Sequence, residues 1–322
     1  MVRGWFVGGC FTVWLGIRLG TFVGGGECVR YMSSSAFEAG AWLEGVDGQR
    51  FPVSRTCSIG RSRGNQLVLA DIRVSRQHAV IQMQLPGEYW VVDFGTVNGT
   101  RVDGRRIAVP TRLRDGSRIE VGGQGLVFRQ PVMGLTSSHE TVSTTATMHD
   151  LRRVPVWLLV TDIVDSTHYF KSVPTDKLPQ LVGQWFSRCR ELMDGAGGYI
   201  NQYLGDGFFG HWVDGEGVES RVGGAVRGLL AMQRGGVPEF RWVLHLGEVL
   251  AGGVMSPGEE TLMGPDMHFV FRMEGVAKEL GRRVLLSEPA AQRMGGLFSF
   301  VEAGRLGVKG FEGERLFLTL AG

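Results

Sequence analysis

The spacing of hydrophobic positions changes near the middle of this chain. Before about residue 130, short runs of β-branched and aromatic residues alternate with glycine and aspartate turns. These runs are Gln66–Leu69, His78–Met83, Tyr89–Phe94, Arg118–Val121 and Leu126–Arg129. Many short strands at close spacing are typical of an all-β sandwich. We therefore predict a β-sandwich domain over residues 41–130.

After residue 155 the pattern predicts alternating strands and helices. Val156–Val160 is a continuous apolar run, as in a buried strand. Apolar residues recur every three or four positions over Lys177–Met193, which predicts an amphipathic helix. An Asp-Gly turn between Tyr199–Leu204 and Phe208–Val213 predicts a hairpin. The remaining expected elements are helices at Val218–Met232 and Phe269–Leu280 and strands at Phe240–Val249, Val284–Ser287 and Leu316–Leu320. We therefore predict an α/β or α+β domain over residues 156–322.

Two further segments have different compositions. Residues 131–155 are predicted to be a flexible linker, because eight of the twelve residues in Thr136–Thr147 are Ser or Thr and almost none can be buried. The first 40 residues contain an apolar, glycine-rich stretch that Arg18 interrupts. This stretch permits three interpretations: a weak membrane segment, a signal peptide, or a misassigned start upstream of a true start at Met32. We favour the third.

Charge and cysteine content argue against several classes of partner and of structural site. The 322 residues include 34 basic and 32 acidic side chains, a net charge of +2, which does not favour nucleic acid or a membrane surface as partner. The four cysteines are scattered without a CxxC pair, so neither a disulfide framework nor a zinc ribbon is expected. We predict a cytoplasmic protein, with a membrane-anchored form that has a cytosolic body as the alternative.

The loops of the predicted sandwich carry an ordered set of polar residues. In sequence they are Gly60-Arg61, Asn65, Ser75-Arg76-Gln77-His78 and the stretch Asp93-Phe94-Gly95-Thr96-Val97-Asn98-Gly99-Thr100. Their order and spacing resemble a forkhead-associated (FHA) domain. The resemblance implies that the domain binds phosphothreonine through Arg61, Ser75, Arg76, Thr96 and Asn98. A phosphate monoester suits Arg61, whose guanidinium is a forked, permanently charged donor.

The second domain contains another ordered set of motifs. It comprises TDIVDST with Asp162, the LGDG turn with Asp206, Leu244–Val249, Arg272-Met273-Glu274 and Val308-Lys309-Gly310. The set resembles the catalytic domain of class III adenylate/guanylate cyclases. The resemblance implies a ferredoxin-like α+β fold and conversion of ATP to cyclic AMP and pyrophosphate. The complete fold expected is therefore an FHA sandwich followed by a cyclase domain.

The resemblance also implies roles for individual residues. Asp162 and Asp206 would hold two Mg²⁺ or Mn²⁺ ions, for which carboxylate oxygens are suitable ligands. Backbone N–H groups near Ser166 and Thr167 would contact phosphates at a helix start. Arg272 would stabilise charge on the α-phosphate, and Lys309 would bind the terminal phosphates. In the family, two protomers share each site, so a head-to-tail homodimer is expected.

Three positions depart from the family pattern. Gln202 replaces the lysine that reads the purine, and its partner position is Thr261. An amide both donates and accepts, so ATP is expected but GTP stays open. His268 replaces the asparagine that orients the ribose, which leaves catalysis at a reduced rate or a lapsed site as alternatives. Asp165 replaces a glycine that is common in the family.

Two functional hypotheses follow from this reading. The first is an adenylate cyclase that responds to phosphorylation through its FHA domain. The second is a catalytically lapsed, dimeric scaffold that depends on a phosphopeptide. The FHA ligand is expected to be a phosphothreonine protein or the chain's own linker, where Asp150 stands three residues after Thr147. A threonine-rich linker also arises from composition alone, so Thr147 is a candidate only.

Overall fold

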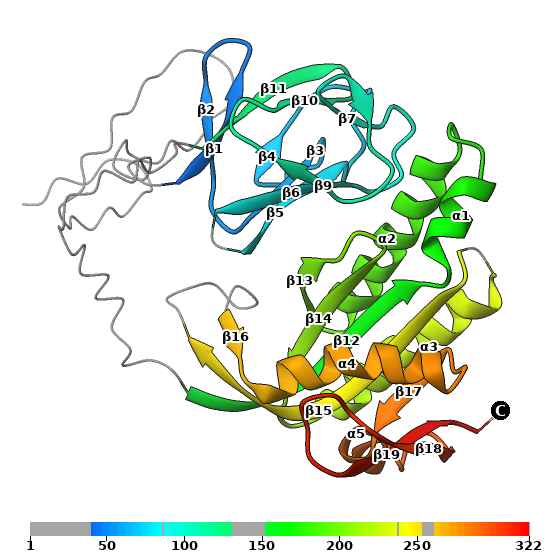
Figure 1. Cartoon of the computed structure of the whole chain (residues 1–322). Helices are drawn as coiled ribbons and strands as arrows, with labels where there is room; N and C mark the ends of the chain where they lie inside the picture. The colour runs from blue at the N-terminus through cyan, green and yellow to red at the C-terminus, as the bar shows by residue number, and fades with distance from the viewer. Residues whose placement is uncertain (1–39, 86, 131–151, 237, 253–260, 322) are drawn as a thin grey trace, which may run out of the picture.

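A computed structural model describes residues 40–85, 87–130, 152–236, 238–252 and 261–321 (Figure 1). The predictions for residues 1–39 and for Thr147 lie outside this part of the chain. Among the described residues, no helix is long and apolar enough to cross a membrane. Two cysteines in the described part, Cys57 and Cys189, are buried free thiols.

The first domain is the predicted β-sandwich. One sheet has the order β2-β1-β11-β10-β7-β8 and the other β4-β3-β5-β6-β9. The strands are β1 (Ala41–Gly45), β2 (Arg50–Val53), β3 (Thr56–Gly60), β4 (Leu67–Val68), β5 (Ala79–Leu85), β6 (Glu88–Asp93), β7 (Thr100–Val102), β8 (Arg105–Arg106), β9 (Thr111–Leu113), β10 (Arg118–Val121) and β11 (Gln124–Arg129). Side chains that alternate inward fill the core, with Leu43, Ile59, Ile81 and Phe128 fully buried.

The second domain has the predicted α+β fold. Its first part runs β12 (Arg152–Ile163), α1 (Ser166–Ser172), α2 (Leu178–Gly195), β13 (Tyr199–Tyr203), β14 (Gly207–Val213), α3 (Val218–Arg234) and β15 (Phe240–Gly252). The second part adds β16 (Thr261–Met263), α4 (Pro265–Glu279), β17 (Val284–Ser287), α5 (Glu288–Arg293), β18 (Phe300–Gly307) and β19 (Glu314–Leu320). The sheet order is β13-β14-β12-β15-β17-β19-β18, with β16 on β15. Its β13-β14-β12-β15 half is the ferredoxin-like arrangement.

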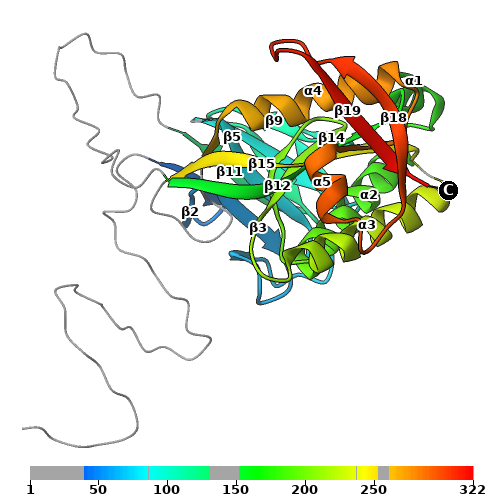
Figure 2. The ribbon, with the colours of Figure 1, turned by 90° about the horizontal axis from the view of Figure 1, so that it is seen from below.

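Helices cover both faces of this sheet (Figure 2). Trp157 and Leu159 of β12 pack into the core beneath α2 and α3. Leu158 and Val160 point to the opposite face and pack beneath α4. Because β12 is buried on both sides, its sequence is continuously apolar rather than alternating.

Two predicted boundaries need correction. The strand predicted to start at Val156 starts at Arg152, so the last residues of the predicted linker belong to the domain. Arg152 and Arg153 extend the strand because they pair with Ala251 and Leu250 of β15. The helix predicted from Phe269 starts at Pro265, where a proline at the first helical position is favourable.

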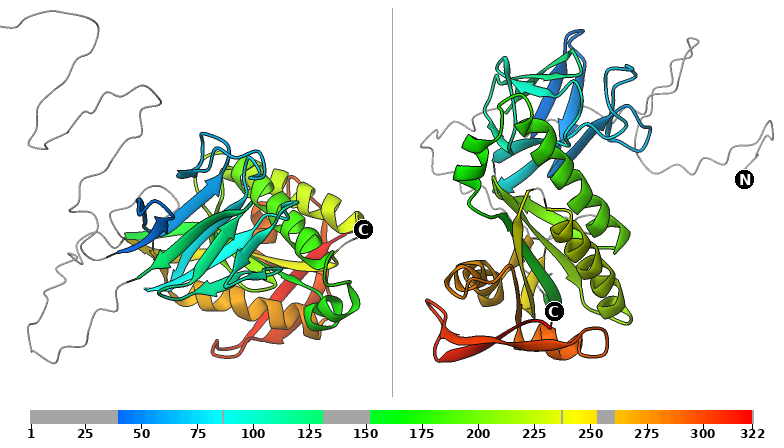
Figure 3. Two further views of the ribbon diagram at one scale, coloured as in Figure 1. Left: turned by 90° about the horizontal axis from the view of Figure 1, so that it is seen from above. Right: turned by 90° about the vertical axis from the view of Figure 1, so that its right-hand side faces the viewer.

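The two domains pack against each other (Figures 1 and 3). Val80, Val92 and Phe94, on the outer face of the β5–β6 sheet, belong to the same buried cluster as α2. The Arg190 guanidinium of α2 lies 5.0 Å from the centre of the Phe94 ring. Without this contact, the apolar side chains on the outer face of the sandwich would be exposed to water. The contact with α2 therefore explains why these positions are apolar.

The backbones of Gly95 and Gly183 come close together across this contact. A Cβ built on Gly183 would lie 2.0 Å from the Gly95 nitrogen and 2.9 Å from the Asp93 carbonyl oxygen. Both neighbours are backbone atoms, which cannot move aside as a side-chain tip can. Gly183 lies inside α2, where glycine is normally unfavourable, so domain packing explains its presence there.

We expect Gly183→Ala to separate the domains, although alanine is the better helix former. The clash should lower the free energy of unfolding by about 1–3 kcal/mol and increase the radius of gyration in small-angle scattering. The matched control is Gly224→Ala in α3, where an added Cβ meets nothing within 4 Å. This control should raise stability by about 0.5–1 kcal/mol. Equal stabilisation by both variants would contradict the glycine contact.

Candidate functional site

The loops at one end of the sandwich bring Arg61 next to Ser75. The Arg61 backbone N–H donates to the Ser75 carbonyl at 2.8 Å, and its side-chain Nε donates to the Val74 carbonyl at 3.2 Å. Asn65 joins the same two loops by donating to the Arg76 carbonyl at 2.7 Å. A Cβ on Gly60 would lie 2.4 Å from that carbonyl oxygen, so glycine is needed there.

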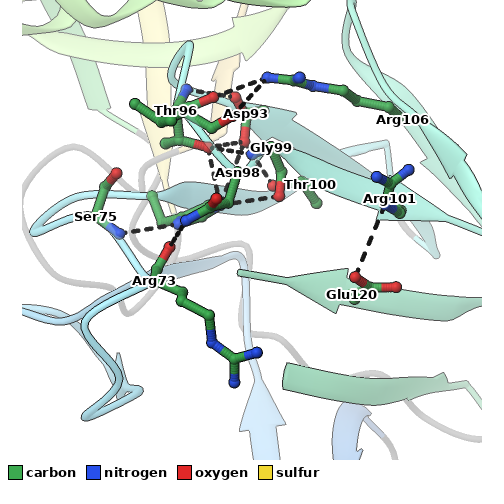
Figure 4. A network of polar contacts seen from close by, with 12 residues as sticks. Arg73, Ser75, Asp93, Thr96, Asn98, Gly99, Thr100, Arg101, Arg106 and Glu120 are labelled. Atoms are coloured by element: carbon green, nitrogen blue, oxygen red, sulfur yellow. Dashed lines mark hydrogen bonds and ion pairs between the residues drawn. The ribbon is translucent and has the colours of Figure 1, made fainter. Parts of the chain in front are cut away.

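A buried polar network supports these loops (Figure 4). His78 Nδ1 accepts the Ser75 N–H at 3.0 Å, so its Nε2 carries the proton and faces the Thr96 hydroxyl at 2.9 Å. Burial lowers the pKa of His78, in keeping with this neutral form. The Thr96 hydroxyl donates to Asp93 Oδ2 at 2.8 Å, and the Thr100 hydroxyl donates to the same oxygen at 2.7 Å.

This network corrects the role expected for Thr96. Thr96 is only 5% exposed, and its hydroxyl contacts Asp93 and His78. Thr96 therefore positions the loop and does not present its hydroxyl to a ligand. Asn98 is exposed, and its amide donates to the Arg73 carbonyl at 2.6 Å, two residues before Ser75. Arg76 is also exposed on this loop.

Of the two predicted metal-binding aspartates, Asp162 lies in β12 and Asp206 lies in the turn before the neighbouring strand β14. Asp162, near the end of β12, is opposite Gly207 of β14 in the antiparallel register. The Ile163 N–H donates to the Asp206 carbonyl at 2.9 Å, which holds the turn against the strand end. Strand β12 and the β13–β14 hairpin are therefore adjacent.

Arg241 is part of this site and was missed from the sequence. On the other side of β12, Asp162 is opposite Arg241 of β15. Arg241 Nη1 donates to Asp162 Oδ2 at 2.9 Å and to Glu274 Oε1 at 3.3 Å. The residue is 8% exposed. A charged residue among the apolar residues that begin this strand is the signal that could have identified it.

The surroundings of Asp162 fit a cation. Burial raises the pKa of Asp162 to about 7, against the lowering effect of Arg241. Its Oδ1 atom is buried and has no hydrogen-bond partner among the described residues, which leaves one oxygen available to an ion. In the described part of the chain, no group of three or more His, Cys, Asp or Glu could hold a metal. The two aspartates would therefore need further oxygen ligands, which a triphosphate can supply.

Three predicted catalytic residues meet in a separate hollow. His268 and Arg272 lie one turn apart on α4, and Lys309 follows β18. With Gly264, Pro265, Gly310 and Phe311 they line a hollow of about 560 Å³. Neither Asp162 nor Asp206 lines it. One chain therefore presents a carboxylate site and a cationic site in different places.

The other predicted contacts are at element ends. Ser166 and Thr167 begin α1, and the first helical bond runs from the Tyr169 N–H to the Asp165 carbonyl. Asp165 has φ 46°, a left-handed conformation that suits glycine and that aspartate tolerates, which explains the substitution at this position. Gln202 lies in β13, partly buried. Thr261 starts β16, but its side chain lies outside the described residues.

Comparison with known proteins separates the chain into the same two parts. The FHA domain family model matches residues 57–122. The glycogen accumulation regulator GarA of Mycolicibacterium smegmatis is 38% identical over 82 residues, which are 25% of this chain and 51% of that protein. Adenylate cyclase 1 of Rhizobium meliloti is 25% identical over 173 residues, 49% of this chain and 26% of that protein. The chain thus spans about half of one relative and a quarter of the other.

Solved structures give matches over the second domain. The adenylyl cyclase CyaB from P. aeruginosa has 16% identity and a TM-score of 0.45, over 53% of this chain and 96% of that chain. A guanylyl cyclase has 18% identity and a TM-score of 0.45, over 54% and 94%. The order of strands and helices in the second domain is βαββαβ, with the sheet order of a ferredoxin-like fold. The chain therefore contains an FHA domain at residues 57–122, followed by a ferredoxin-like α+β domain that is similar in sequence to adenylate cyclase 1 of Rhizobium meliloti.

Proposed function

We propose that this chain is an adenylate cyclase that converts ATP to cyclic AMP and pyrophosphate and is controlled by phosphothreonine binding to its FHA domain. The observation that carries the proposal is the adjacency of Asp162 and the Asp206 turn across paired strands, with an unpartnered carboxylate oxygen on Asp162. The adenylate cyclase relative from Rhizobium meliloti supports the same reaction.

The reaction forms one bond and breaks one bond at the α-phosphorus. The ribose 3′-hydroxyl gives its proton to solvent, its oxygen attacks the α-phosphorus, and the bond to the oxygen that bridges to the β-phosphate breaks, so pyrophosphate leaves. Asp162 and Asp206 would hold Mg²⁺ or Mn²⁺, which when bound acidifies the 3′-hydroxyl and neutralises the triphosphate. Arg272 would stabilise negative charge on the α-phosphate and Lys309 would bind the terminal phosphates. His268 would donate to the ribose.

These residues point to a site that two chains complete. The hollow with His268, Arg272 and Lys309 does not include the aspartates of the same chain. In a head-to-tail homodimer, the carboxylates of one protomer would face the cations of its partner. Such a dimer contains two equivalent sites because the contact is symmetric.

The FHA domain would read a phosphothreonine with Arg61, Ser75, Arg76 and Asn98. Arg61 supplies a charged donor and Ser75 a hydroxyl, both suited to phosphate oxygens. Asn98 would bond the main chain of the ligand. The ligand is a phosphothreonine protein or the chain's own linker at Thr147, which lies outside the described residues.

His268 favours a second candidate, a lapsed cyclase domain that acts as a dimeric phosphopeptide-dependent scaffold. Imidazole is bulkier than the carboxamide that the family places there. The two candidates differ in turnover. If His268→Asn makes cyclic AMP and the unaltered chain does not, the result supports the lapsed scaffold. If the unaltered chain makes cyclic AMP, the result excludes it.

Mixing two inactive variants tests the shared site. We expect Asp162→Ala and Arg272→Ala each to lower cyclic AMP synthesis at least 100-fold. When equal amounts exchange subunits, half of the dimers should be mixed and should carry one intact site of two. About one quarter of wild-type activity should therefore return. No recovery from exchanged mixtures would refute a site built from two chains.

Peptide binding tests the FHA site. We expect Arg61→Ala to weaken binding of a phosphothreonine peptide more than tenfold, because a charge-assisted bond to phosphate is lost. Suitable probes are peptides with aspartate three residues after phosphothreonine, including residues 141–153 phosphorylated at Thr147. Arg101→Ala is the matched control, since Arg101 faces Glu120 on β7 and β10 (Figure 4). Fluorescence anisotropy gives both affinities, and equal losses would contradict the assigned pocket.

Metal dependence should vary with pH. Because the pKa of Asp162 is about 7, a proton competes with the cation below that value. The affinity for Mn²⁺ should therefore rise as pH increases from 5.5 to 7 and level off above it. The measurement is the half-saturating Mn²⁺ concentration for cyclic AMP synthesis at each pH. A constant value across this range would show that Asp162 does not bind the ion as a carboxylate.

A further inference from the structure

The β13 strand is at the edge of the cyclase sheet, and the FHA domain covers it (Figure 1). Edge strands leave main-chain carbonyls without a partner strand. A bulge in β13 adds a further unpaired residue, because Asn201 is an extra residue between the paired positions Ile200 and Gln202. Satisfying these carbonyls requires donors from outside the sheet.

Two glutamines of β5 supply the donors. Gln82 and Gln84, the latter the extra residue of a bulge in β5, both contact β13 and so point away from the sandwich core. Gln82 Nε2 donates to the carbonyls of Ile200, at 3.1 Å, and of Asn201. Gln84 Nε2 donates to the Tyr203 carbonyl. The FHA domain thus binds the strand that carries the base-reading position.

These contacts determine which way the Gln84 amide faces. A main-chain carbonyl can only accept, so the nitrogen of Gln84 must face Tyr203. The Gln84 Oε1 atom is then left to accept, and Gln202 Nε2 donates to it at 3.4 Å. With its nitrogen engaged in this way, Gln202 retains its Oε1 atom as a hydrogen-bond acceptor for a ligand.

That orientation distinguishes the two purines. Adenine carries a 6-amino donor where guanine carries the O6 acceptor. An acceptor at Gln202 suits adenine and repels guanine. We propose that Gln84, from the FHA domain, is a positioning residue that orients the Gln202 amide and so makes the nucleotide site prefer ATP over GTP. This inference rests on the proposed function, since it assumes that Gln202 reads the base.

Equilibrium competition tests this role without requiring turnover. ATP and GTP compete with a fluorescent ATP analogue for the full chain in Mn²⁺, which yields the ratio of their dissociation constants. We expect ATP to bind more tightly to the unaltered chain and Gln84→Met to reduce the preference about tenfold, the equivalent of one lost directed hydrogen bond. Gln84→Lys should go further and favour GTP, because its ammonium can donate to both Tyr203 and Gln202 Oε1 and turn the amide.

The matched control is Gln82→Met. It removes contacts to the same strand but none to Gln202, so it should leave the ratio unchanged. A ratio that Gln84 variants do not alter, or that Gln82→Met alters equally, would overturn the positioning role. The positioning role would also be overturned if the unaltered chain binds neither nucleotide or binds both equally.

Cyclic nucleotide synthesis, measured in the same samples, separates this inference from the proposed function. Cyclic AMP formed with a preference insensitive to Gln84 would overturn the positioning role alone. A preference that follows Gln84 without any cyclic nucleotide product would support the positioning role and overturn the cyclase.

Discussion

The pairing of β12 with β14 on one side and β15 on the other determines where the reactive groups of the second domain lie. Asp162 lies between Gly207 and Arg241 because of this register. A shift by one residue would turn Asp162 to the opposite face and move the apolar side chains of β12 out of their cores. Burial on both faces therefore fixes the carboxylate near the end of β12, next to the turn with Asp206.

The pair of Asp162 and Arg241 shows how a buried carboxylate is accommodated in this fold. Burial disfavours a bare carboxylate, and Arg241 compensates for part of that cost by bonding one oxygen. Glu274 on α4 contacts the same guanidinium, so the helix that presents Arg272 is tied to the strand that presents Asp162. The carboxylate site and the cationic face of α4 are thereby held in a constant relation within each chain.

The contact between the two domains also depends on surfaces that match. The outer face of the β5–β6 sheet is apolar where it meets α2 and polar where it meets β13, and each part suits its neighbour. Gly183 allows the backbones to approach, and the glutamines satisfy the edge carbonyls. In the proposed adenylate cyclase, the contact of the FHA domain with β13 would give it a direct physical means of influencing the nucleotide site.

The sequence by itself determined both fold classes, the β13–β14 hairpin and the residues of each motif, because periodicity, turn residues and ordered motifs are local signals. It did not reveal the short strands β7 and β8, the start of β12 at Arg152 or the buried position of Thr96, which depend on partners distant in the chain. Arg241, Gly183, Gln82 and Gln84 likewise have no local signature of their roles. Only the tertiary structure decided these, since strand register and domain packing select which side chains meet.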